Sequence, residues 1–76
     1  MFRTKKMIVT KILIKTGGIL VTRECPTSKD PVDTDSRCLH IVNELRRSRP
    51  SRWLRVGDIA ARVADIAGVA VGIEEA

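Results

Sequence analysis

The sequence is poor in the residue types that most enzymes need. Among 76 residues there is one histidine, one tryptophan, one phenylalanine and no tyrosine. His40 has no second candidate base in a catalytic motif, and the serines lie in predicted loops or at predicted helix ends. We therefore expect a binding protein rather than an enzyme, and we expect it to carry no cofactor.

Cysteine is also scarce, with only Cys25 and Cys38. A small secreted domain usually carries more, so the pair indicates a reducing compartment and two small buried side chains rather than a bridge. With His40 the cysteines form a C-x12-C-x-H pattern, the alternative being a metal site. A structural zinc site takes four ligands, however, and on a helix Cys38 and His40 point about 200° apart. We expect no metal.

Long hydrophobic runs are absent as well. The first 15 residues, MFRTKKMIVTKILIK, have the basic start and apolar stretch of a signal peptide. Lys11 and Lys15 interrupt that stretch, and no small-residue cleavage site follows it. No segment approaches the roughly 18 to 20 apolar residues that span a bilayer. We expect a soluble cytoplasmic protein that makes no contact with a membrane.

The apolar residues that are present, 43% of the chain, are almost all aliphatic. A chain of this length is near the lower limit for a single hydrophobic core, so residues 1–76 predict one small domain. Such a domain is marginally stable alone and would gain stability by forming a homodimer or by binding a partner.

Residues 6–25 predict a β-hairpin, because two segments rich in β-branched residues flank Gly17-Gly18. A two-residue turn at these glycines places Ile14 opposite Val21 and Lys11 opposite Glu24, a favourable cross-strand pair. In this register one side of the hairpin is apolar and buried. That side comprises Ile8, Ile12, Ile14, Ile19, Val21 and Cys25.

An acidic, proline-containing loop is predicted at 26–35, followed by a helix at about 36–48. Asp33 and its neighbours offer N-cap oxygens and negative charge at the positive end of the helix dipole. Apolar residues then recur with helical spacing, and Pro50 ends the helix. The apolar stripe comprises Cys38, Ile41, Val42 and Leu45.

A second helix is predicted at about 58–67, with Asp58 as its N-cap and Gly68 following its end. The alternation of valine and isoleucine in GVAVGI predicts a short strand at 69–73 that joins the hairpin's sheet. Together the elements predict an α+β fold, in which the N-terminal hairpin packs on two helices.

The stretch VGDIAARVADIAGVAV resembles the middle of a helix-turn-helix unit, in which an "IA" pair and a small residue precede a tight turn and a recognition helix. The resemblance covers about sixteen residues and implies DNA binding. Beyond Gly68, however, the chain reads VAVGIEEA, which has no lysine, arginine, asparagine or glutamine to contact a base edge. We therefore do not expect a conventional recognition helix.

The net charge is +5, and its distribution is uneven. Residues 1–25 carry six bases and one acid, residues 26–45 carry two bases and four acids, and residues 56–76 carry one base and four acids. Residues 46–55, RRSRPSRWLR, carry five arginines, no acid and the only tryptophan. Basic and acidic segments therefore alternate along the chain.

Helix-end electrostatics can account for two of these arginines but not for five, because the effect fades within the last turn. We therefore predict a surface that binds nucleic acid through its phosphate backbone. Trp53 is either a core anchor or a contact to a base. The predicted site comprises Arg46, Arg47, Arg49, Arg52, Trp53 and Arg55, extended by Lys11 and Lys15.

The alternative is a protein-interaction module that binds a partner's acidic or nucleic-acid-binding surface. In its small size, its compact stand-alone form and its lack of catalytic residues, the chain is similar to the small inhibitors encoded by phages and mobile elements, such as anti-CRISPR proteins. The acidic segments favour this alternative, because a pure DNA binder gains little from nine acids.

Overall fold

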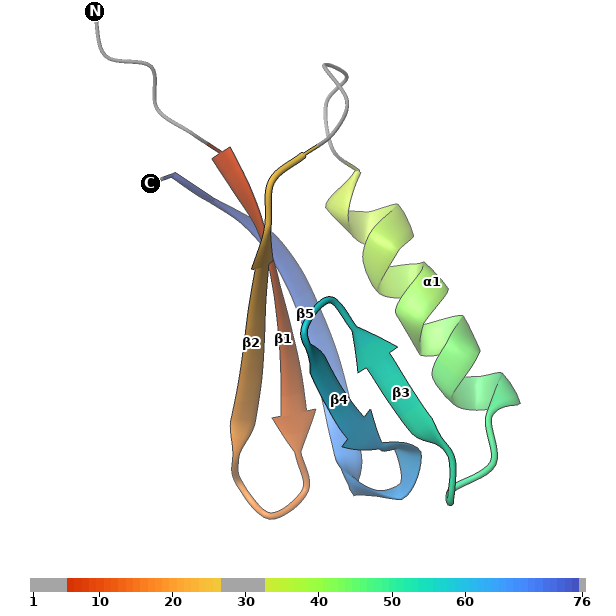
Figure 1. The fold of residues 1–76 in the computed structure, drawn as a ribbon. Coiled ribbons are helices and arrows are strands. Elements are labelled where there is room, and N and C mark those ends of the chain that lie inside the picture. The colour runs from red at the N-terminus through yellow and green to blue at the C-terminus, as the bar shows by residue number, and fades with distance from the viewer. Residues whose placement is uncertain (1–5, 27–32, 76) are drawn as a thin grey trace, which may run out of the picture.

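A computed structural model describes residues 6–26 and 33–75. Within these residues the chain forms five strands, one α-helix and one short 3-10 helix (Figure 1). The elements are β1 (Lys6–Ile14), β2 (Ile19–Glu24), α1 (Thr34–Arg47), β3 (Trp53–Val56), β4 (Ile59–Arg62), η1 (Val63–Asp65) and β5 (Ile66–Glu75). Neither helix is long and apolar enough to cross a membrane.

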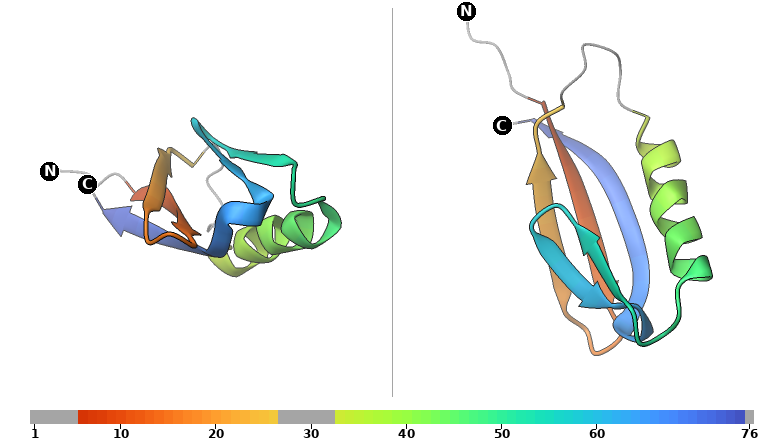
Figure 2. Two further views of the ribbon diagram at one scale, coloured as in Figure 1. Left: turned by 90° about the horizontal axis from the view of Figure 1, so that it is seen from below. Right: turned by 45° about the vertical axis from the view of Figure 1, so that its right-hand side comes forward.

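The strands form two antiparallel sheets, a three-stranded sheet in the order β2-β1-β5 and a two-stranded β3-β4 hairpin. The hairpin lies over one face of the larger sheet, and α1 runs along the β5 side, with β3 nearer to the helix than β4 (Figure 2). We call the covered face the inner face and the opposite one the outer face.

The core lies between the inner face and the hairpin. Ile12 is fully buried and clusters with Ala61 of β4 and Ile66 of β5. Half-buried aliphatic side chains from every strand and from α1 surround this cluster, namely Ile14, Leu20, Leu45, Leu54, Val56, Ile59 and Val69. The core is aliphatic, as the scarcity of aromatic residues predicted.

The predicted packing of an N-terminal hairpin on two helices is wrong, because the described residues contain a single α-helix and mostly strands. The segment predicted as a helix at 58–67 instead forms β4, η1 and the start of β5. Ile59, Ala61 and Val63 also fit the two-residue period of a strand, and the structure follows that period as far as Arg62, the end of β4. The strand predicted at 69–73 is the middle of a longer one.

Asp58 does not cap a helix. It lies in the two-residue turn between β3 and β4, where Gly57 adopts a φ of +57°. A glycine at the first turn position, followed by a residue without positive φ, is typical of a type II′ hairpin. Asp58 Oδ1 accepts a hydrogen bond of 2.7 Å from Thr22 Oγ1, which holds the turn against β2.

The predicted hairpin of β1 and β2 is present, but the predicted register is wrong. The turn comprises four residues, 15–18, and is closed by a hydrogen bond of 2.8 Å from Ile14 N to Gly18 O. Gly17 has a φ of +104°, whereas Gly18 has no positive φ, so the two glycines do not form the expected two-residue turn. Lys11 consequently lies opposite Val21 rather than Glu24.

The register differs from the predicted one by three residues, and an odd shift turns every β2 side chain to the other face. Leu20 and Thr22 therefore face the core. Ile19 is 57% exposed at the outer face. Glu24 Oε2 instead lies 3.6 Å from the guanidinium of Arg37 on α1.

Helix α1 lies where the sequence placed a helix at 36–48, with its boundaries shifted slightly toward the N-terminus. Asp33 is the N-cap and accepts hydrogen bonds from Ser36 N (3.0 Å) and Ser36 Oγ (2.9 Å). These two bonds lower the pKa of the Asp33 carboxyl below its ordinary value, because both stabilise the charged form. Most of the predicted acidic loop, residues 27–32, lies outside the described residues.

We expect Asp33→Ala to lower the melting temperature at neutral pH, and we expect the difference from the wild type to narrow in acid. A group whose pKa is lower in the folded state stabilises the fold above its unfolded pKa, and this contribution is lost as pH falls through the folded pKa. Thermal unfolding followed by circular dichroism from pH 7 to below the ordinary pKa of 3.8 measures the difference. A difference that stays constant over this range would contradict the role assigned to the cap.

Candidate nucleic-acid interface

The β3-β4 hairpin separates apolar from charged side chains. Leu54 and Val56 of β3 point toward the core and are half-buried, while Trp53 and Arg55 are exposed on the opposite side. Alternation along a strand requires this separation, because successive side chains point to opposite faces. The turn fits tightly, since a Cβ on Gly57 would lie 2.5 Å from Thr22 Oγ1. The hairpin is therefore attached to the sheet by its inner side and presents its outer side to solvent.

Trp53 is 60% exposed and does not anchor the core. It lies directly across the hairpin from Arg62 of β4. The guanidinium carbon of Arg62 is 5.4 Å from the centroid of the Trp53 ring, a distance at which a cation is attracted to the π-system. The structure therefore adds Arg62 to the exposed arginines around the tryptophan.

The segment between α1 and β3 carries further arginines and is held by backbone hydrogen bonds. Arg52 N donates to Arg49 O (3.0 Å), and Arg52 O accepts from Val63 N of η1 (2.8 Å). Pro50 O accepts from Ala64 N (3.0 Å). The side chains of Arg49 and Arg52 are exposed on this fixed backbone.

Ser48, rather than an arginine, caps the C-terminus of α1. Its backbone N–H donates to Glu44 O (3.0 Å) and Leu45 O (3.4 Å), and its hydroxyl donates to Glu44 O (2.7 Å). Arg46 and Arg47 occupy the last turn and are exposed. Hydrogen bonding to the helix end therefore does not account for these two arginines.

Six arginines make up what we call the arginine surface, namely Arg46, Arg47, Arg49, Arg52, Arg55 and Arg62. All six are exposed. In the described parts of the chain, the only ion pairs are Arg23 with Glu74 and Arg37 with Glu24. No described carboxylate therefore lies within 4.0 Å of a guanidinium nitrogen of the arginine surface.

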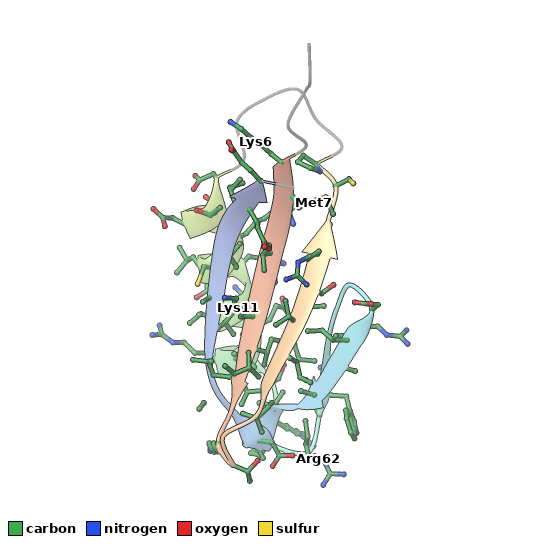
Figure 3. The ribbon with its side chains drawn as sticks, turned by 90° about the vertical axis from the view of Figure 1, so that its left-hand side faces the viewer. Lys6, Met7, Lys11 and Arg62 are labelled. Atoms are coloured by element: carbon green, nitrogen blue, oxygen red, sulfur yellow. The ribbon has the colours of Figure 1, made fainter. Side chains whose placement is uncertain are left out.

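The two lysines predicted to extend this site are placed differently. Lys15 lies in the β1-β2 turn, at the same end of the molecule as the arginine-bearing segment (Figure 1). Its backbone N–H donates to Asp65 O of η1 (2.8 Å). Lys11 instead lies on the outer face of the three-stranded sheet, away from the hairpin and α1 (Figure 3). The structure therefore does not bring Lys11 together with the arginines.

A groove separates α1 from β3, and it consists of two adjoining hollows of about 460 and 380 Å³. His40, Ile41, Arg55 and Val56 line both. The second hollow is also bordered by Arg52, Trp53, Glu44 and Ser48. The first hollow is also bordered by Glu24 and Arg37, so the groove carries three arginines and two glutamates. The arginine surface reaches this groove through Arg52 and Arg55.

The alternative metal ligands do not meet. Cys25 is exposed just beyond β2, with its Sγ 3.4 Å from Met7 Sδ. Cys38 is half-buried on α1, with its Sγ 3.6 Å from Val69 O of β5. Both cysteines are free thiols, and His40 faces the groove. Within the described residues no three histidine, cysteine or acidic side chains form a group that could hold a metal ion.

Arg62 is the one member of the arginine surface that sequence reasoning missed. The signal was the Gly57-Asp58 pair between two short segments, a dipeptide typical of a two-residue hairpin turn. Reading Asp58 as a helix cap placed Arg62 on a helix, away from Trp53. A strand at 59–62 would have placed Arg62 opposite Trp53 directly.

In its described residues the chain is a small, strand-rich domain with one α-helix and a basic surface at one end. The chain matches no protein-family model, and comparisons with curated proteins and with solved structures gave no significant match.

Proposed function

We propose that this protein binds nucleic acid, with the arginine surface contacting the phosphate backbone. The observation that carries the proposal is the set of six exposed arginines, free of described carboxylate partners, on the last turn of α1, the segment after it and the β3-β4 hairpin that bears the exposed Trp53. Guanidinium groups form paired, charge-assisted hydrogen bonds with phosphate oxygens. Like charges that repel one another in the free protein would be neutralised by such a ligand.

The contacts assigned to phosphate carry no sequence information, so we expect broad binding to nucleic acids rather than recognition of one site. Lys15, at the same end of the molecule, adds a seventh positive charge that attracts the anionic ligand. Lys11 does not take part, since it lies on the outer face of the sheet.

Binding should weaken steeply as salt rises, because neutralised phosphates release counterions. With up to six arginines engaged on a duplex, the plot of log K against log salt should have a slope of about −3 to −5. Fluorescence anisotropy with labelled DNA and RNA at several salt concentrations measures this slope.

Polyglutamate at equal charge concentration is the matched competitor. We expect it to displace the nucleic acid poorly. If no nucleic acid binds even at low salt, the proposal is wrong, and an acidic protein surface becomes the partner to seek.

A further inference from the structure

We propose that Trp53 stacks on an unpaired base, so that the arginine surface selects single-stranded over double-stranded nucleic acid. This inference rests on the proposed function and adds the class of ligand. It does not distinguish DNA from RNA, because both supply an unpaired base beside a phosphate.

The packing of the fold does not account for Trp53. The core is built from aliphatic side chains, and Trp53 is 60% exposed on the far side of the hairpin from that core. A large aromatic ring left in water on a binding surface is a common contact for ligands, and bases of any sequence offer it a flat π-face.

The hairpin that carries the ring is attached to the rest of the fold, and an arginine already lies over the ring in the free protein. The inner side of the hairpin packs through Leu54 and Val56 against the core cluster, and the bond from Thr22 to Asp58 fixes the turn. The guanidinium of Arg62 lies over the Trp53 ring at 5.4 Å from its centroid. A base stacking on the other side of the ring would complete a layer of arginine, tryptophan and base.

Two arginines lie close enough to reach the phosphates beside a stacked base. Arg55 is two residues along the same strand from Trp53, which corresponds to about 7 Å. Arg62 lies directly across the hairpin from Trp53, and the Cβ atoms of the two residues are about 5 Å apart. Stacking and phosphate contacts can therefore be made together by one short piece of strand.

A duplex cannot use this arrangement. Its bases are stacked on each other and present only their edges in the grooves, so the ring would meet a base face only after that base is flipped out. A duplex would contact the arginines alone. The tryptophan therefore gives single strands an interaction that a duplex lacks.

The test uses the full chain, whose only tryptophan makes its intrinsic fluorescence a direct report on this ring. Three ligands of equal length are titrated: a single strand, its duplex and a single strand of abasic sites. We expect the base-containing strand to quench the fluorescence and to bind more tightly than the other two. The DNA and RNA versions of the strand should behave alike in this respect.

Trp53→Ala should weaken binding of the labelled single strand by about fivefold or more, and binding of the duplex by less than twofold. Trp53→Phe keeps a stacking ring and should retain most of the affinity. Leu39→Ala is the matched control, because Leu39 is 59% exposed on α1 and lies outside the arginine surface. Melting curves of all three variants confirm that each is folded.

The outcomes separate the inference from the proposed function. Equal affinities for the three ligands, or an equal loss for single strand and duplex in Trp53→Ala, would overturn the stacking inference while leaving phosphate binding intact. Absence of binding to every ligand would overturn both.

Discussion

Replacing Ile12 by alanine is expected to lower the free energy of unfolding by about 2 to 5 kcal/mol. Ile12 has no exposed surface and lies between Leu20 of β2 and Val69 of β5 in the sheet. Truncation would leave a cavity beside Ala61 and Ile66, which the surrounding strands cannot fill without moving. This loss is a large share of the total, because a domain of this size has a free energy of unfolding of only about 4 to 11 kcal/mol. Urea denaturation followed by circular dichroism measures it.

Ile19→Ala is the matched control for that experiment. Ile19 is 57% exposed, so its truncation should change the free energy of unfolding by about 0.5 kcal/mol or less. A two-residue turn at Gly17-Gly18 would instead bury Ile19 on the same side as Ile12. Similar losses from the two substitutions would therefore contradict the register of the β1-β2 hairpin.

The sequence predicted α1 well because several local signals agree there. Asp33 supplies a cap, the apolar residues recur with a single clear period, and Pro50 follows closely. The β1-β2 hairpin was also predictable from its β-branched segments. Its register was not, because two consecutive glycines permit several turns and the choice depends on how the strands pack on the rest of the fold.

The C-terminal third was predicted less well because its pattern is ambiguous. In DIAARVADIA the apolar residues fit a helix, but Ile59, Ala61 and Val63 also fit a strand. Alanine favours a helix intrinsically, yet here Ala61 is only 5% exposed and fits closely against the core of a sheet. Tertiary packing decided between the two, and local preference could not.

How much of the site could be predicted also depended on whether local sequence or tertiary pairing determines the structure. The five arginines of residues 46–55 are adjacent in sequence, so their proximity followed from the sequence alone. The exposure of Trp53 and the approach of Arg62 depend on the β3-β4 hairpin and became visible only with its pairing. Lys11 was expected to extend the arginine site, and only the position of the sheet shows that the outer face, on which Lys11 lies, points away from the β3-β4 hairpin.

The fold explains how so many like charges coexist at one end of a small domain. Each arginine extends from a backbone fixed by other groups: Ser48 caps α1, η1 binds the 49–52 segment, and aliphatic side chains hold the hairpin. The charged groups are not needed to keep that backbone in place. Their mutual repulsion is a cost that an anionic ligand would relieve.

The double substitution Arg47→Glu and Arg52→Glu is expected to weaken nucleic-acid binding by at least about 100-fold, the loss of two charge-assisted contacts. Both side chains are exposed, and Arg52 is fixed through its backbone, so the fold should persist. We expect a decrease in stability of no more than about 1 kcal/mol, partly because a glutamate at the end of α1 opposes the helix dipole. Anisotropy at low salt and a melting curve measure the two effects.

The comparison of Arg52→Glu with Lys11→Glu separates local contact from total charge. Each single substitution lowers the net charge by two, but Lys11 lies on the outer face of the sheet. If the arginine surface contacts phosphate, Arg52→Glu should weaken binding much more than Lys11→Glu, whose remaining effect is long-range and screened by salt. Equal losses from the two substitutions would mean that binding follows the overall charge of the molecule, and the arginine surface would then have no special role.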